Sequence, residues 1–185
     1  MERFSFGAAE KSIFQFAYTV DDIEKGMRRY SELLHIGPWF LIGPFVPVKG
    51  MYRGAVTKMK ISLALAFLGE IMIELIERRD AEPSVFQETV KARGGHGFHH
   101  WGIGARDFDA AVAHYKSRGY REAFSDIAPS GGRVVYLDTT VALPGMVEII
   151  EITAAVEEHF GRIHQAARAW DGRYAVVRLE PKRPS

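Results

Sequence analysis

Two glutamates interrupt strongly apolar stretches of the sequence. Glu74 follows Ile71-Met72-Ile73, and Glu148 follows Gly145-Met146-Val147. A buried carboxylate is costly unless it is paired, protonated or bound to a metal ion. Both positions are therefore candidates for metal binding or acid–base chemistry, although a single glutamate on a strand is more often a salt-bridge residue at the rim.

Gln15 and His100 are two further polar residues on strand-like segments. Successive residues of a strand point to opposite faces. In the segment 13–18, Gln15 therefore lies opposite an aromatic face, which we expect to pack beneath a helix over residues 21–35. The same alternation places His100 inside and predicts that His99 and Trp101 point outward, so that His99 is not a ligand partner of His100. Taken alone, either polar residue could be a hydrogen-bonded core residue.

The chain repeats itself. Residues 13–23 resemble residues 98–108, and each segment ends in an Asp and an apolar residue. The helical stripe Ile23, Met27 and Tyr30 recurs as Phe108, Val112 and Tyr115 with a constant offset. Gln15 and His100 are related by that same offset. Glu74 and Glu148 are related by a shorter one, so the first half has a longer connection, which we place in residues 43–52.

The repeat predicts a strand, a helix and three strands, twice. Strands are expected near 12–18, 38–42, 55–67 and 70–77, and again near 98–104, 120–126, 132–138 and 145–152. Helices are expected near 21–35 and 107–118, starting at Asp22 and Asp107, with a short one near 85–92. Repeat one covers about 10–77, repeat two about 97–153, and a C-terminal helix about 154–171. This helix covers a sheet face or forms a dimer contact. We treat residues 1–185 as a single domain.

A pseudo-twofold arrangement of the two repeats would bring their equivalent inward positions toward one centre. Gln15 and His100 form one equivalent pair, and Glu74 and Glu148 form the other. Polar residues at all four positions favour one shared metal site. Three oxygen donors and one imidazole suit a single divalent ion such as Zn, Ni, Co, Mn or Mg.

These features resemble the vicinal oxygen chelate superfamily, which includes glyoxalase I, methylmalonyl-CoA epimerase, extradiol dioxygenases and bleomycin-resistance proteins. The resemblance is carried by the repeat, by Phe98-His99-His100-Trp101-Gly102, and by the two Ile/Val-Glu-hydrophobic-hydrophobic-Glu strands. It covers about residues 10–153, and residues 84–100 look most like the epimerase branch. It implies an α+β, glyoxalase-like fold in which two βαβββ repeats form a curved mixed sheet, with an added C-terminal helix.

Carried over residue by residue, the resemblance implies that Gln15, Glu74, His100 and Glu148 are the metal ligands. Zinc-using glyoxalase I has this same set of Gln, Glu, His and Glu. Methylmalonyl-CoA epimerase typically has His at the first position and Gln at the second, so the chain departs from that pattern twice. Extradiol dioxygenases bind iron with two His and one Glu, and Gln15 in place of the first His argues against oxygen activation.

The predicted chemistry is proton transfer next to a carbonyl. A bound ion polarises the carbonyl oxygen, and a base then removes the proton from the adjacent carbon. We expect Glu148 to be this base and Glu74, on the opposite side, to return the proton, because the glyoxalase and epimerase families suggest that either carboxylate can leave the metal. The chain would be an isomerase, an epimerase or a glyoxalase-like lyase that acts on a small carbonyl or thioester substrate.

Two other functions stay open. One is a protein that sequesters a small ligand without chemistry, as bleomycin-resistance proteins do. Aromatic residues could line its pocket, although core packing is the simpler explanation for most of them: Trp39, Phe40, Phe45, Tyr52 and Phe67. The other is a dioxygenase-like metalloenzyme.

Composition excludes several further classes. The 185 residues contain no cysteine, so thiolate sites and disulfides are ruled out. Lys plus Arg is 24 against 23 for Asp plus Glu, and these charges are scattered, so no nucleic-acid partner is expected. The longest apolar run, residues 63–68, is too short to span a membrane. We expect a cytoplasmic protein that forms a homodimer, as family members often do.

Overall fold

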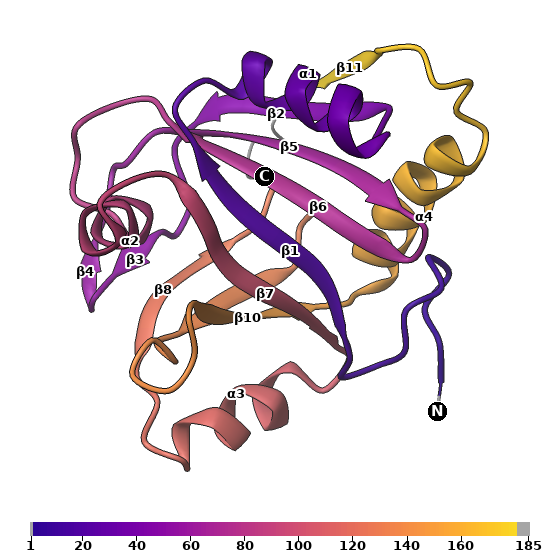
Figure 1. Ribbon diagram of the computed structural model, residues 1–185. Helices are drawn as coiled ribbons and strands as arrows, with labels where there is room; N and C mark the ends of the chain where they lie inside the picture. Colours follow the sequence, from indigo (N-terminus) through magenta and orange to yellow (C-terminus); the bar gives the residue numbers. More distant parts are fainter. Residues whose placement is uncertain (1, 181–185) are drawn as a thin grey trace.

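The structure, a computed structural model, describes residues 2–180 and contains one mixed sheet with helices on its faces (Figure 1). The helices in this part of the chain are α1 (Ile23–Leu34), α2 (Val85–Arg93), α3 (Phe108–Lys116) and α4 (Ala154–Arg168). The central strands are β1 (Ile13–Val20), β2 (Trp39–Phe45), β5 (Ile61–Leu68), β6 (Ile71–Arg78), β7 (Gly97–Ala105), β8 (Glu122–Ile127), β9 (Arg133–Leu137) and β10 (Met146–Glu151). Three short strands lie at the edges: β3 (Met51–Tyr52), β4 (Ala55–Val56) and β11 (Val176–Leu179).

The order of the strands shows the duplication. β1 and β7 pair antiparallel at the centre of the sheet. From there the first half runs outward as β6, β5 and β2, and the second half runs outward as β10, β9 and β8. β1 pairs parallel with β6, and β7 pairs parallel with β10 in the same way. The expected α+β fold of two βαβββ units is therefore confirmed.

The longer connection of the first half differs from the expectation. The strand predicted over 55–67 is divided into β4 and β5, and the expected loop over 43–52 contains β3. β3 pairs with β8 of the second half, so this segment crosses from one repeat to the other. β11 was not expected either, and it adds to the outer edge of β2 after α4. These strands depend on pairing with distant partners, which a local pattern does not reveal.

Each repeat begins its helix with the predicted aspartate. The side chain of Asp22 accepts a hydrogen bond from the backbone N–H of Lys25, and the side chain of Asp107 accepts one from that of Ala110. These bonds satisfy donors that the first helical turn leaves free. α1 and α3 then pack on the outer faces of their own halves (Figure 1).

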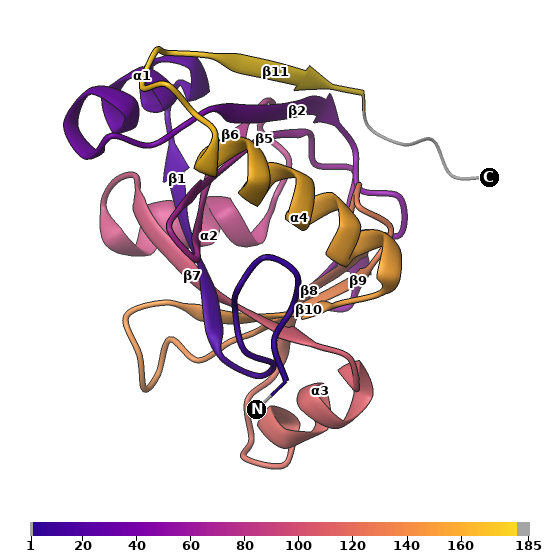
Figure 2. The ribbon, with the colours of Figure 1, turned by 90° about the vertical axis from the view of Figure 1, so that its right-hand side faces the viewer.

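α4 lies across the opening between the two halves (Figure 2). Its residues Val156, Phe160 and Ile163 are buried with residues from both repeats, among them Leu65 and Ile150. The C-terminal helix therefore closes one side of the space between the halves, where it covers the inner face of the sheet. None of the helices in the described range is long and apolar enough to cross a membrane.

Two bulges interrupt the pairing of β1 with β7 at equivalent places. The register skips Phe14 on β1 and His99 on β7. A bulge places two residues of one strand opposite one residue of its partner and re-aims the side chains nearby. The expectation that Phe14 packs beneath α1 is consequently wrong. Phe14 instead contacts the rings of Phe6 and Phe160. Phe16 and Tyr18 do pack in the cluster beneath α1.

Candidate metal centre

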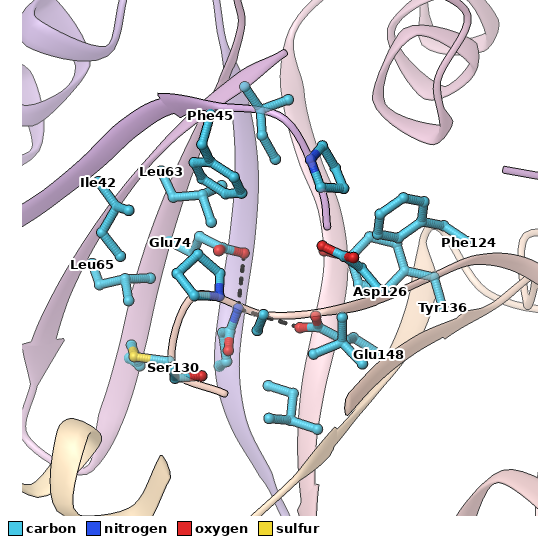
Figure 3. A pocket seen from close by; sticks show the side chains of 18 of the residues that line it. Ile42, Phe45, Leu63, Leu65, Glu74, Phe124, Asp126, Ser130, Tyr136 and Glu148 are labelled. Atoms are coloured by element: carbon cyan, nitrogen blue, oxygen red, sulfur yellow. Dashed lines mark hydrogen bonds between the residues drawn. The ribbon is translucent and has the colours of Figure 1, made fainter. Parts of the chain in front are cut away.

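The four central strands each contribute one polar side chain to a common point. β6, β1, β7 and β10 are consecutive neighbours in the sheet, and they carry Glu74, Gln15, His100 and Glu148 respectively. All four residues are buried, with no more than 6% of their surface exposed. Figure 3 shows Glu74 and Glu148 turned toward each other across the pocket. The convergence predicted from the repeat is present.

The distances in this cluster are short. The Nε2 atom of His100 lies 3.1 Å from Oε2 of Glu148 and 3.4 Å from Oε2 of Glu74. The ligand atoms of these three residues all lie within 4.8 Å of one another. Gln15 Nε2 donates a hydrogen bond to Oε2 of Glu74 at 2.8 Å and lies 3.5 Å from Oε2 of Glu148. One ion of ordinary size could contact all four side chains.

The carboxylates of Glu74 and Glu148 favour a positive charge between them. Burial alone would lower the pKa of His100, but the neighbouring Glu148 and Glu74 outweigh it and raise that pKa to about 9. Burial raises the pKa of Glu148, and the His100 imidazolium only partly offsets this effect. The protonated imidazole thus occupies the electrostatic role that a metal cation would take.

The amide of Gln15 also fits a cation. Its Oε1 atom is buried and has no hydrogen-bond partner, while its Nε2 faces the carboxylates. A buried acceptor without a partner is unfavourable. An amide can present either its oxygen or its nitrogen by rotation about its last side-chain bond. The oxygen is therefore available as a ligand, and the residues present suit a hard or borderline divalent ion.

His99 does not point outward, contrary to the prediction from strand alternation. It is fully buried, and its Nδ1 lies 2.8 Å from Nδ1 of His100. The bulge at this residue breaks the alternation of faces and turns both rings to the inner side. Burial, together with the charge on His100, lowers the pKa of His99 well below 6.5. Nδ1 of the neutral His99 accepts a hydrogen bond from the Nδ1–H group of His100, and Nε2 of His100 is directed at the two glutamates.

Two residues at the site escaped the sequence reasoning. Tyr136 on β9 lies opposite Glu148 in the register, hydrogen-bonds to it, and packs its ring 4.6 Å from that of His100. Gly102 on β7 pairs with both Gln15 and Glu148. A Cβ atom there would lie 2.7 Å from Cβ of Gln15, so glycine is required where the strands carrying the site approach each other. The register of the strands would have been needed to find either residue.

A mainly apolar cavity opens from this cluster and encloses about 680 Å³, part of it open to solvent. Phe160 of α4, Phe86 of α2 and Phe124 of β8 line it from three sides. Of the five aromatic residues proposed for a pocket, Phe45 lines this cavity, whereas Trp39 is buried in the cluster beneath α1. Asp126 also lines the cavity and was not predicted.

Comparison with known proteins identifies the family. A family model described as the Glyoxalase/Bleomycin resistance protein/Dioxygenase superfamily matches residues 14–136. The chain belongs to this superfamily. No curated protein matches the chain significantly.

Solved structures of the superfamily's fold resemble the chain at low identity. A hypothetical protein from Bacillus halodurans C-125 is 21% identical, with a TM-score of 0.58 over 77% of this chain and 94% of that one. A methylmalonyl-CoA epimerase in complex with methylmalonyl-CoA and NH4+ is 16% identical, with a TM-score of 0.56 over 80% and 98%. The methylmalonyl-CoA epimerase from Mycobacterium tuberculosis is 16% identical, with a TM-score of 0.56 over 82% and 95%. These likenesses show the fold.

The contact at Gly102 predicts a localised cost of substitution. Gly102→Ala should lower the free energy of unfolding by about 1–3 kcal/mol, because the new methyl group has to displace Gln15 and overpack the centre of the sheet. Gly95→Ala is the matched control, since a Cβ atom there meets nothing within 4 Å. Urea unfolding of both variants measures the difference, and equal stability would show that the strands carrying the site are not so closely packed.

The raised pKa of His100 predicts how stability depends on pH in metal-free protein. Its folded value of about 9 lies above the ordinary value of 6.5, so its contribution is complete below pH 6.5 and is lost as the pH rises through 9. Urea unfolding with a chelator present should therefore show stability falling across this range. His100→Asn should flatten that part of the profile, whereas the exposed-site control His114→Asn should keep it. A wild-type profile that stays level or rises would contradict the proposed charge state.

Proposed function

We propose that the chain is a divalent-metal-dependent enzyme that moves a proton next to the carbonyl of a small organic substrate. Such a protein would be an isomerase, an epimerase or a glyoxalase-like lyase. The observation that supports this most is the buried convergence of Glu74, His100 and Glu148, with ligand atoms within 4.8 Å of one another. The amide of Gln15 completes a set of three oxygen donors and one imidazole. Cytoplasmic location and dimer formation stay predictions.

The metal would be held by Oε1 of Gln15, by Nε2 of His100 and by the carboxylates of Glu74 and Glu148. Bound there, a divalent ion supplies positive charge that polarises a carbonyl oxygen and acidifies the neighbouring C–H group. His99 fixes the ring of His100 through the Nδ1 contact of 2.8 Å, the kind of support that orients a metal-binding imidazole.

Glu148 is the proposed base. Burial raises its pKa, which brings its basicity closer to what proton abstraction from carbon needs. Tyr136 hydrogen-bonds to its carboxylate and keeps it oriented. Glu74 faces it from the other side of the pocket and would return the proton (Figure 3). The apolar walls exclude water, so that the carboxylates act on substrate in a medium of low polarity.

The relatives support the reaction class and leave the substrate open. Two of the solved structures named above are methylmalonyl-CoA epimerases, and one of them contains methylmalonyl-CoA. At 16% identity we infer from them only a substrate with a carbonyl or thioester group. Gln15 and Glu74 at the first two ligand positions match the set of zinc-using glyoxalase I instead.

The apolar cavity favours a second candidate, a protein that binds a small molecule without changing it. Its lining is mainly hydrophobic and aromatic with a few polar groups, as in sites that bind small molecules. The two candidates differ in whether the buried carboxylates bind metal and act on a C–H bond, and the following experiments separate them.

Metal analysis tests the first requirement. After loading in turn with Zn, Ni, Co, Mn or Mg and extensive dialysis, at least one of these ions should remain at one equivalent per chain, measured by elemental analysis. Gln15→Ala and His100→Asn should bind that ion at least tenfold more weakly, since each removes one ligand. His114→Asn, a substitution on the exposed face of α3, should bind it normally. Retention of none of these ions by the wild type would favour the non-catalytic candidate.

Hydrogen exchange tests the proposed base. In D2O, the loaded protein should exchange the α-hydrogens of 2-hydroxyacetophenone or of methylmalonyl-CoA faster than buffer does, as followed by NMR. Glu148→Gln should lower this rate by about 10²–10⁴, the usual contribution of a positioned base, while metal content stays at one equivalent. Glu158→Gln, on the exposed side of α4, is the control. Undiminished exchange in metal-loaded Glu148→Gln would exclude Glu148 as the base.

A further inference from the structure

Asp126 is a buried acid in the cavity that the proposed chemistry does not use. It lies on β8, two residues after Phe124, so both side chains point to the inner face of the sheet. Only 8% of its surface is exposed. Figure 3 shows its carboxylate facing into the pocket from the wall that Phe124 and Tyr136 form.

Backbone groups hold this carboxylate in place. The N–H of Lys49 donates to Oδ1 of Asp126 at 2.8 Å, and the backbone N–H groups of Val48 and Ile127 also bond to it. Burial raises the pKa of Asp126, while these three donors act in the opposite direction and favour its charged form. Its partners are thus backbone dipoles, two of them from the connection that follows β2 and one from β8 itself, and none of them carries a positive charge.

The remaining charges around the cavity are also acidic. Glu74 and Glu148 line it together with Asp126, and His159 of α4 contributes an imidazole. Among the described residues that line the cavity, none is Lys or Arg. A divalent ion at the proposed centre would offset Glu74 and Glu148 and leave the charge of Asp126. An anionic group that entered this apolar space would therefore lose its water and meet a like charge.

The walls themselves are apolar. The cavity is lined from strands of both halves of the sheet and from two helices by Phe45, Leu65, Phe86, Phe124, Ile150 and Phe160. Rings and branched side chains of this kind favour burial of an aromatic or aliphatic group. Among the described residues that line the cavity, Asp126 is the carboxylate that stands apart from the metal cluster.

We propose that the cavity selects a neutral, mainly apolar substrate that carries a hydroxyl or N–H group, and that Asp126 receives the hydrogen bond from this group. The proposal rests on the proposed function for the position of the carbonyl, and it assigns the other end of the substrate. It also disfavours methylmalonyl-CoA as the substrate, because its free carboxylate and phosphates find no Lys or Arg among the described residues that line the cavity.

Three naphthalene compounds of similar size test this assignment on the protein as purified. 2-Naphthol is neutral near pH 7.5 and donates a hydrogen bond, 2-methoxynaphthalene is neutral without a donor, and 2-naphthalenesulfonate is an anion that binds metals poorly. Fluorescence titration should show 2-naphthol binding at least tenfold more tightly than the sulfonate and at least threefold more tightly than the methyl ether. Equal or tighter binding of the sulfonate would overturn the charge selection, and equal binding of the methyl ether would overturn the donor.

Asp126→Asn removes the charge and keeps an oxygen that the Lys49 N–H can reach. In this variant the preference for 2-naphthol over the sulfonate should fall below threefold, whereas Asp21→Asn, on an exposed residue outside the cavity, should keep the wild-type preference. If a folded Asp126→Asn protein keeps the wild-type preference for 2-naphthol over the sulfonate, Asp126 only holds the loop in place and the proposal is overturned. If this variant does not fold, the three wild-type affinities decide the matter.

The outcome is separable from that of the proposed function. Metal content and hydrogen exchange test the cluster of Gln15, Glu74, His100 and Glu148, whereas the ligand preferences are read from binding alone. The titrations are repeated after chelator treatment, and the same preference for 2-naphthol is expected there. A preference that appears only in metal-loaded protein would place the naphthol at the metal centre and overturn the assignment to Asp126.

Discussion

Two carboxylates that face each other in the dry centre of the sheet set the main physical constraint on this molecule. Glu74 and Glu148 are both buried, and each lies within 3.4 Å of the same imidazole nitrogen of His100. Two carboxylates that share a buried site are stabilised by a positive charge between them, and without it one of them takes up a proton. The four strands that meet at this point are the innermost strands of the two repeats, so the duplication of the fold brings the charges together and also supplies His100 to hold them.

The repeat was sufficient to predict this convergence, because it depends on equivalent positions and not on exact strand ends. Gln15 and His100, like Glu74 and Glu148, occupy matching places in the two halves, and the pseudo-twofold order of the strands makes matching places neighbours. The alternation of faces along a strand correctly predicted that these four side chains point inward. It gave the wrong direction for Phe14 and His99, where the two bulges lie. A bulge follows from the register with a partner strand, and nothing in the local pattern of either segment indicates one.

Residues that depend on register or on edge pairing were not predictable in the same way. Tyr136 belongs to the site because β9 aligns it with Glu148, and Gly102 belongs because its strand lies between those of Gln15 and Glu148. In the sequence Asp126 stands at the end of a predicted strand, and nothing there indicates that the distant Lys49 N–H bonds to it. Its spacing of two from Phe124 was a usable signal that both side chains share a face.

The duplicated and the unduplicated parts of the chain contribute differently to the pocket. The four polar residues of the cluster come from β1, β6, β7 and β10, which have counterparts in both repeats. Much of the wall comes from segments without a counterpart: Phe160 from α4, Phe86 from α2, and Pro47 from the long connection of the first half. These segments can change without moving the central strands. The repeated strands therefore fix the position of the polar cluster, and the segments without a counterpart determine the shape of the pocket around it. Asp126 lies where the two contributions meet, on a repeated strand but held by the backbone of the long connection.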